Sequence, residues 1–457
     1  GPGSGFGIRA QPHRRSRHSS FLDQRWIDAC CSGKRGTSSL DLTGTFLLRK
    51  VEATLRIQNT AMPVVVVNCK LGALAIMRSL GEQGIPIYGV DADPRSPGML
   101  SRYCKRSFLY GYDEARPERF LEELLRVGKE VGRTSILIPT SDETAVFVTE
   151  YAEPLSRWFI FPSNAPSLMR ELISKKGMYD LVARHGVPTP FTLFPERLDD
   201  LEASLHRVKF PLMLKGIYGN RLQARGKKKM VVVHSEKELI EQYKEMEEPG
   251  FPNLMLQEYI PGGDDQIFMF NGYFNQTSDC AIGLTGYKIR QFPIHVGCTS
   301  LGECRWNEAV GKMTMQFMKA IHYRGVLDIG YRFDPRDGQY KVLDINPRVG
   351  QAFRLFVAED DMDVVKALYL DLTGQKQPMI IPREGRRWMI EDFDLISSND
   401  YYQEGTLSFL DWFRSLKGLE EAAWFNRKDL RPFFVMAGGL LKRMRSWSGK
   451  TIGRRMV

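Results

Sequence analysis

The sequence contains no run of about 18 uncharged apolar residues, so it predicts no helix that spans a membrane. Its seven cysteines form no C-x-x-C pair, which argues against a zinc site, and their odd number argues against a closed disulfide framework. That usage predicts a reducing, cytoplasmic location. The G-x-G-x-x-G turn and the G-x-x-x-x-G-K-[ST] loop are both missing, which excludes the common dinucleotide and P-loop sites.

A basic surface over the folded part of the chain is also missing. The net charge is +10, but residues 1–62 contribute +6 and residues 427–457 contribute +8, which leaves −4 for residues 63–426. Nucleic-acid binding needs basic side chains on the folded domain, so no nucleic-acid partner is expected.

Alternation of strand-like and helical segments predicts an α/β (α+β) protein with a doubly wound domain at 63–165. Within it, the segment 140–143 follows a strand's carboxyl end, where such sheets usually bind ligands. Later strands have the alternation of antiparallel hairpins, which predicts a second domain over 166–376. Residues 1–62 contain a cloning remnant and read as a disordered basic leader, with Met62 as the predicted natural start.

Residues 377–457 form a predicted helical extension in which basic side chains accompany Trp and Phe. We expect helices over Tyr401–Phe413 and Leu430–Trp447. Two readings stay open for them: they cover the folded core, or Phe433–Leu441 with its basic flank contacts a membrane surface peripherally.

The strongest chemical signal is a predicted hairpin that closes the second domain. Its first strand carries Asp328 and its second carries Asp344-Ile345-Asn346-Pro347-Arg348. Alternate side chains share one face of a strand, so Asp344 and Asn346 are expected to project together, with Asp328 on the partner strand. Two carboxylates and an amide oxygen suit Mg²⁺ or Mn²⁺, and Arg348 offers a bidentate donor for a phosphoryl group or carboxylate.

Two lysines and a glycine-bearing basic loop precede this hairpin. Lys175 lies just before a predicted helix over Lys176–His185, and Lys215 ends a predicted strand. The loop at 216–229 has the composition of a phosphate-binding lid. A further strand ends in Glu258-Tyr259-Ile260-Pro261-Gly262, a turn that offers backbone groups to an adenine, with Asp265 beyond it for the ribose.

The order of these motifs resembles the ATP-grasp superfamily over about residues 63–375, in particular the carboxylate–amine ligases that include D-aspartate ligase and the large carbamoyl-phosphate synthase subunit. The resemblance implies an ATP-dependent ligase that forms an amide through an acyl-phosphate and releases ADP and phosphate. Its substrates would be a small carboxylate and an amine, such as an amino acid or peptide. A homodimer is the default expectation.

The resemblance also implies a role for each candidate residue. Lys175 and Lys215 would contact the phosphates of ATP; Glu258 and the Tyr259–Ile260 backbone would hold adenine, and Asp265 the ribose. Asp328, Asp344 and Asn346 would hold Mg²⁺. The catalytic side chains would be Arg348, which stabilises the acyl-phosphate, and Lys288 and Arg290, which meet the γ-phosphate or the substrate.

The chain departs from the superfamily pattern at two metal positions. Many relatives carry Glu where Gly330 stands here, and Asp344 stands where Glu is usual. Two alternatives therefore stay open: a biotin-carboxylase-like ATP-grasp enzyme, which requires bicarbonate, and a degenerate nucleotide-binding protein without turnover.

Overall fold

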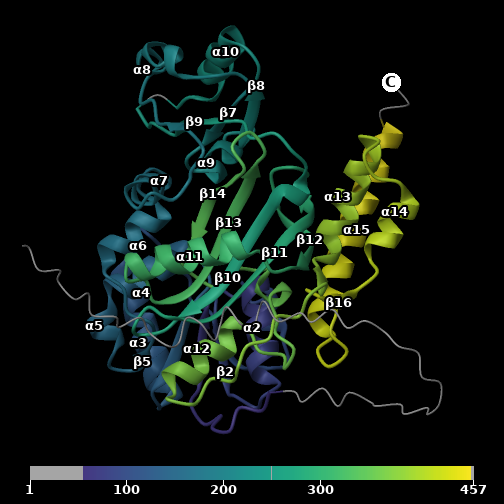
Figure 1. Cartoon of the computed structure of the whole chain (residues 1–457). Helices are drawn as coiled ribbons and strands as arrows, with labels where there is room; N and C mark the ends of the chain where they lie inside the picture. The colour runs from purple at the N-terminus through teal and green to yellow at the C-terminus, as the bar shows by residue number, and fades with distance from the viewer. Residues whose placement is uncertain (1–54, 249, 454–457) are drawn as a thin grey trace, which may run out of the picture. The chain divides into compact units, whose positions relative to one another are not determined.

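The computed structural model describes residues 55–248 and 250–453, whose strands form three β-sheets (Figure 1). The first sheet is parallel, with strand order β3-β2-β1-β4-β5. Its strands are β1 (Val64–Val67), β2 (Ile87–Val90), β3 (Cys104–Phe108), β4 (Ser135–Pro139) and β5 (Phe159–Ile160). The helices that follow them are α2 (Leu71–Gly81), α3 (Pro117–Val131), α4 (Asp142–Glu150) and α5 (Ala152–Leu155).

Strand β1 explains why this sheet has helices on both faces. All four of its valines are buried, and alternate side chains point to opposite faces of the sheet. Val64 and Val66 pack in one core with side chains of α2, whereas Val65 and Val67 pack in another with side chains of α3 and α4. The predicted doubly wound domain is therefore confirmed as a fold.

The predicted leader and the observed fold differ at one end. Residues 1–54 lie outside the described part of the chain. Residues 55–62 are packed, because Ile57 is 6% exposed within the core and the Leu55 backbone N–H donates to the Asp360 carbonyl at 2.9 Å. The folded part thus begins before the predicted start at Met62.

A small antiparallel sheet of order β6-β9-β7-β8 follows two helices, α6 (Pro166–Ile173) and α7 (Lys175–Arg184). Its strands are β6 (Thr192–Leu193), β7 (Leu212–Gly216), β8 (Met230–Val233) and β9 (Leu254–Glu258). Helices α8 (Leu198–Ala203), α9 (Gly219–Ala224) and α10 (Glu236–Met246) accompany it, and α9 occupies part of the predicted lid at 216–229.

The largest sheet has seven strands in the order β14-β13-β10-β11-β12-β15-β16. They are β10 (Ile267–Phe274), β11 (Cys280–Phe292), β12 (Cys298–Cys304), β13 (Gly325–Asp334), β14 (Gln339–Asn346), β15 (Arg387–Met389) and β16 (Leu419–Ala422). Helix α11 (Glu308–Ala320) shares a core with Phe270 and Phe274 of β10, while α12 (Val364–Leu372) shares another with Tyr273 of that strand. These helices therefore cover opposite faces of the sheet.

The C-terminal region contributes strands as well as helices. Strands β15 and β16 extend the largest sheet, and α13 (Glu391–Gln403), α14 (Phe409–Ser415) and α15 (Arg431–Gly453) follow or flank them. The predicted helix over Tyr401–Phe413 is wrong: α13 ends before Gly405, whose φ of 77° only glycine adopts readily, and α14 begins afterwards. The predicted boundaries at 165/166 and 376/377 stay predictions.

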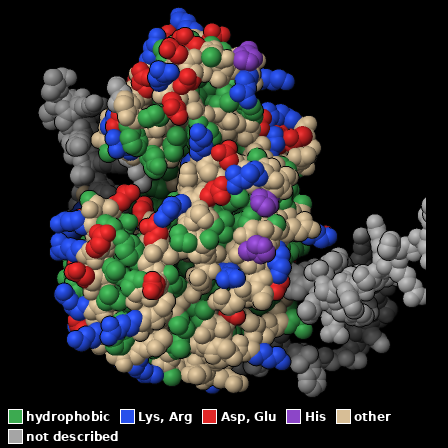
Figure 2. All heavy atoms as spheres, turned by 90° about the vertical axis from the view of Figure 1, so that its left-hand side faces the viewer, with side chains coloured by type: hydrophobic (Ala, Val, Ile, Leu, Met, Phe, Trp, Pro, Cys, Tyr) green, Lys and Arg blue, Asp and Glu red, His purple; other side chains and the backbone are tan. Residues whose placement is uncertain are grey.

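Two observations bear on location and partners. Among residues 55–248 and 250–453, none of the helices combines the length and hydropathy that a bilayer crossing requires. On the face shown in Figure 2, Lys and Arg are interspersed with Asp and Glu and form no broad basic surface.

Candidate active site

The hairpin of β13 and β14 brings its polar residues onto one face. Asp328 lies opposite Asn346, and Gly330 lies opposite Asp344, in the antiparallel register of the two strands. Because Asp328 and Gly330 are two residues apart, as are Asp344 and Asn346, the side chains at these positions share a face. The Asn346 side-chain amide also donates to Asp344 Oδ2 at 3.4 Å. The predicted metal residues are therefore neighbours in space.

The pKa values of the two carboxylates of this hairpin are shifted in opposite directions. Burial raises the pKa of Asp328 to about 6, and the Asp344 charge adds to the shift while Arg348 opposes it. Burial also raises the pKa of Asp344, but the Lys175 ammonium outweighs it, so that the pKa of Asp344 lies below its ordinary value. Such divergence between neighbouring carboxylates is typical of functional sites.

Lys175 and Lys215 approach this face from two other elements. Lys175 is the first residue of α7, and its ammonium forms an ion pair with Asp344. That carboxylate outweighs burial and raises the pKa of Lys175. Lys215 of β7 forms no ion pair with any of the described residues: burial, with the nearby Lys175 charge, lowers its pKa to about 7. Lys215 Nζ instead donates to the side-chain oxygen of Gln257 at 2.8 Å.

Gln257 is a residue that the sequence analysis missed. It is 3% exposed, and its amide donates to Tyr179 Oη at 2.8 Å and to Thr192 Oγ1 at 3.0 Å. Its partner in the register of β7 and β9 is Met213, two residues from Lys215, so Gln257 and Lys215 face the same way. The signal in the sequence was its position directly before Glu258.

Glu258 faces the opposite way on β9. Its carboxylate accepts from Lys341 Nζ at 2.9 Å and from Arg336 Nη2 at 2.9 Å. Both cations also pair with Asp334, whose pKa their hydrogen bonds hold well below the ordinary range. This network joins β9 to the turn of the β13–β14 hairpin. The geometry thus favours Gln257, rather than Glu258, as the side chain beside Lys215.

The turn after β9 is held by Arg332. Its guanidinium donates to the carbonyls of Ile260 at 3.0 Å and Gly262 at 2.6 Å, and so fixes the segment that includes Tyr259. Asp265 lies in the short 3-10 helix Asp264–Gln266, and its side chain is exposed. The residues predicted to bind the adenine and the ribose therefore follow one another along a turn that Arg332 holds in place.

Arg348 links the hairpin to the first sheet. Its Nε donates to Asp142 Oδ1 at 2.7 Å, and its Nη2 donates to Asn346 Oδ1 at 3.2 Å. Asp142 is the first residue of α4, at the carboxyl end of β4, where the sequence analysis placed a ligand-binding edge. That edge of the first sheet and the β13–β14 hairpin form one site.

Lys288 and Arg290 of β11 have different surroundings. Lys288 is half-buried and donates to Gln291 Oε1 at 3.1 Å and to the Gly297 carbonyl at 2.8 Å; burial lowers its pKa. Arg290 is 3% exposed and binds both oxygens of Asp394 in α13, at 2.8 and 2.9 Å. A guanidinium so enclosed is not available to a substrate, which argues against the predicted catalytic role of Arg290.

The donors at the hairpin fit a divalent cation that takes its remaining ligands from elsewhere. Within the described residues, no group of three or more His, Cys, Asp and Glu side chains is arranged to hold a metal ion. The predicted set has two carboxylates and one amide oxygen, and Mg²⁺ bound to nucleotides typically uses one or two carboxylates plus phosphate oxygens and water.

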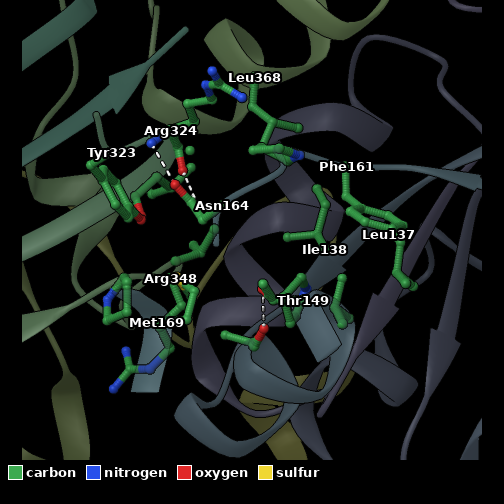
Figure 3. A pocket seen from close by; sticks show the side chains of 18 residues that line it. Leu137, Ile138, Thr149, Phe161, Asn164, Met169, Tyr323, Arg324, Arg348 and Leu368 are labelled. Atoms are coloured by element: carbon green, nitrogen blue, oxygen red, sulfur yellow. Dashed lines mark hydrogen bonds between the residues drawn. The ribbon is translucent and has the colours of Figure 1, made fainter. Parts of the chain in front are cut away.

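A cavity of about 50 Å³ lies behind Arg348, lined mostly by apolar side chains from the first sheet, α4, α6 and the strand β13 (Figure 3). Two of its lining residues are joined by a pair of hydrogen bonds: the Asn164 side chain donates from Nδ2 to the Arg324 carbonyl at 2.7 Å, and its Oδ1 accepts from the Arg324 backbone N–H at 2.9 Å (Figure 3). A space of this size holds one or two water molecules and no substrate.

We compared the chain with known proteins by sequence and by fold. No protein-family profile matches the chain. It is 24% identical over 334 residues to D-aspartate ligase of Enterococcus faecium (strain Aus0004), which covers 70% of this chain and 79% of that protein.

Solved structures show the likeness in fold. The ADP complex of N5-carboxyaminoimidazole synthetase from Staphylococcus aureus has a TM-score of 0.58 at 12% identity and covers 77% of this chain and 89% of its own. An L-amino acid ligase from Bacillus licheniformis has a TM-score of 0.54 at 15% identity and covers 72% and 79%.

The fold is therefore that of the ATP-grasp superfamily. Within that fold, the chain is similar in sequence to a ligase of the carboxylate–amine type, and this similarity supports an enzyme that forms C–N bonds.

Proposed function

We propose that the protein joins a carboxylate to an amine through an acyl-phosphate, with ATP converted to ADP and phosphate. The observation that carries the proposal is the convergence of Lys175, Asp344, Arg348 and Asp142 from α7, β14 and α4 on one face of the hairpin. The likeness to a D-aspartate ligase supports the C–N bond-forming class.

The residues of the site would divide between the phosphates, the metal ion and the adenine of ATP. Lys215 and Lys175 would neutralise the ATP phosphates, and Asp328, Asp344 and Asn346 would hold Mg²⁺ or Mn²⁺. The metal would supply charge neutralisation between the phosphates. Gln257 and the Tyr259–Ile260 backbone would face the adenine.

The chemistry needs positioning more than covalent help from the protein. A carboxylate oxygen of the substrate attacks the γ-phosphorus, the bond from that phosphorus to the ADP oxygen breaks, and ADP leaves. Arg348 and Lys288 would neutralise the acyl-phosphate. The amine nitrogen then attacks the acyl carbon, the C–N bond forms, and phosphate departs as the C–O bond breaks. The segment 216–229 would exclude water meanwhile.

Amino acids are the first carboxylates to test, because the relatives are named as a D-aspartate ligase and an L-amino acid ligase. ADP release with Mg²⁺ and ATP is measured for D-aspartate, other amino acids, small carboxylates and bicarbonate, each with and without an amine. The amines are glycinamide, D-alanine and L-lysine. Turnover that needs one carboxylate and one amine, and that disappears in Asp344→Ala, supports the proposal.

Two other outcomes of the ADP-release experiment would favour a different function. Turnover that needs bicarbonate alone would favour a biotin-carboxylase-like reaction. ATP binding without turnover in any combination would favour a degenerate nucleotide-binding protein.

A location in the cytoplasm, a homodimer and peripheral contact of the C-terminal region with a membrane are further proposals. The last is supported by three helical side chains with more than three-fifths of their surface exposed, Phe409, Phe413 and Phe434.

A further inference from the structure

Helix α4 does not use the Asp142 carboxylate as its cap. The helix N-cap is Ser141, whose hydroxyl accepts from the Thr144 backbone N–H at 3.3 Å, while Thr144 Oγ1 accepts from the Ser141 backbone N–H at 3.3 Å. This reciprocal pair satisfies the first turn. The adjacent Asp142 carboxylate is thus free to act outside the helix.

That carboxylate faces the hairpin, and only one of its two oxygens accepts a hydrogen bond from the described residues. Its Oδ1 accepts from Arg348 Nε at 2.7 Å, and none of the described residues donates a hydrogen bond to Oδ2. The Asp142 side chain is 36% exposed, against 20% for Arg348. Its charge also reaches the site, since it raises the pKa values of both Lys175 and Asp328.

The other charged groups of the site do not suit an amine. A primary amine arrives as an ammonium at neutral pH, and Lys175, Lys215 and Arg348 repel it. Asp344 already pairs with Lys175, and Asp328 and Asp344 are the carboxylates proposed to hold the metal ion. Asp142 lies beside Arg348, the proposed partner of the acyl group, and one of its oxygens is open to a cation.

We propose that Asp142 forms the subsite that receives the ammonium group of the amine substrate, an assignment that rests on the proposed function. The ammonium docks on Oδ2 and loses a proton to solvent before the neutral nitrogen attacks the acyl carbon. Asp142 therefore selects a cationic amine and holds it next to the group that Arg348 binds.

The test compares a cationic with an uncharged nucleophile. Hydroxylamine is uncharged at neutral pH and converts an acyl-phosphate to a hydroxamate, which is measured directly. Asp142→Asn keeps an oxygen to accept from Arg348 and removes the charge. We expect the KM for the fastest amine of the substrate panel to rise about tenfold or more, as for the loss of one charge-assisted contact, with hydroxamate formation nearly unchanged.

Glu153→Gln is the control, because Glu153 is an exposed carboxylate on the neighbouring helix α5, outside the segment 140–143. It should leave both reactions as they are. Asp142→Asn could instead lower the rates of hydroxamate formation and of the amine reaction equally, at an unchanged melting temperature. That result would overturn the subsite and leave Asp142 as a positioning residue for Arg348. Absence of hydroxamate from the unaltered chain with every carboxylate would overturn the proposed function itself, and the subsite with it.

Discussion

Lys215 donates its hydrogen bond to the neutral side chain of Gln257, at 2.8 Å across two neighbouring antiparallel strands. Of the described residues, no Asp or Glu forms an ion pair with this lysine, and its pKa is lowered to about 7. A carboxylate partner would compete with an anionic ligand, whereas an amide orients the ammonium and leaves its charge available. The pair is therefore arranged for a ligand that brings its own negative charge.

ATP binding should take up a proton through Lys215 above neutral pH. In the free protein this lysine is largely neutral above pH 7, whereas phosphate favours the charged form, so binding raises its pKa. Proton uptake should be close to zero near pH 6 and approach one proton between about pH 8 and 9, below the ordinary lysine pKa of about 10.4. Calorimetry in buffers of different ionisation enthalpy measures it.

Lys215→Met should abolish the uptake, and Lys209→Met serves as the control because Lys209 is an exposed lysine on the approach to the same strand. Uptake that persists in Lys215→Met would contradict the assignment. Because the folded-state pKa lies below the unfolded value, Lys215 also costs stability as the pH falls toward 7, and Lys215→Met should be more stable there.

The pair of Arg290 and Asp394 should matter for stability and not for turnover. It is buried, with side-chain exposures of 4% and 0%, and it joins β11 to α13. Asp394→Ala leaves the Arg290 charge without its carboxylate, and loss of one partner of a buried pair typically costs about 3–5 kcal/mol. Urea unfolding should show a loss of this order.

The double variant Arg290→Met with Asp394→Leu is the matched comparison. Replacing a buried pair by apolar side chains is often neutral, so it should recover most of the stability and retain ADP release. A double variant that folds well but has lost turnover would instead support the catalytic role that the sequence suggested for Arg290.

Parts of the fold and of the candidate site could be predicted from local signals in the sequence. The doubly wound order was readable because β1 is a run of valines and α3 begins with Pro117 and ends at Gly132, both local signals. The shared face of Asp328, Asp344 and Asn346 was readable because period-two alternation and a turn at Gly338 define a hairpin. All these signals lie within a few residues of the structure they predict.

What the sequence could not show about these residues depends on long-range pairing. Arg290 looked available because its partner Asp394 is 104 residues away. Glu258 looked like the nucleotide side chain because the register of β9 against β7, which turns Gln257 toward Lys215, is set by tertiary packing. Asp142 was placed at the right edge of the sheet, but its contact with Arg348 joins residues separated by 206 positions.

The C-terminal region should bind vesicles that contain anionic lipid. Phe409 and Phe413 of α14 are 68% and 66% exposed, and Phe434 of α15 is 64% exposed. Residues 427–457 carry nine basic side chains against one acidic, so a second copy would bring like charges together, whereas an anionic bilayer complements them. Flotation with phosphatidylglycerol vesicles should recover the protein, and flotation with neutral vesicles should not.

Changing Phe409, Phe413 and Phe434 to Ser should release the protein from these vesicles. Met379→Ser is the control, since Met379 is 77% exposed and lies outside these helices. No flotation of the unaltered chain, combined with a concentration-dependent dimer that the triple Ser variant loses, would assign the aromatic side chains to self-association instead.

Gly330 should accept the carboxylate that many ATP-grasp enzymes carry at this position. It lies opposite Asp344 in the hairpin, and a side chain there would start in open space, with no atom within 4 Å of its first carbon. Gly330→Glu would place a third carboxylate on the face of Asp328 and Asp344. The folded state should tolerate it, since a side chain in place of glycine also restricts the unfolded chain.

The expected gain is in metal binding, which is measured without turnover. In Gly330→Glu, Mn²⁺ should bind more tightly in the presence of a non-hydrolysable ATP analogue, by electron paramagnetic resonance, and the melting temperature should rise with Mg²⁺. Three carboxylates repel one another until a cation neutralises them, so the gain should appear only with metal present. Gly330→Gln has the same size without the charge and should show neither effect. If Glu and Gln behave alike, Asp328 and Asp344 do not face a metal ion, and the magnesium assignment at the β13–β14 hairpin is wrong.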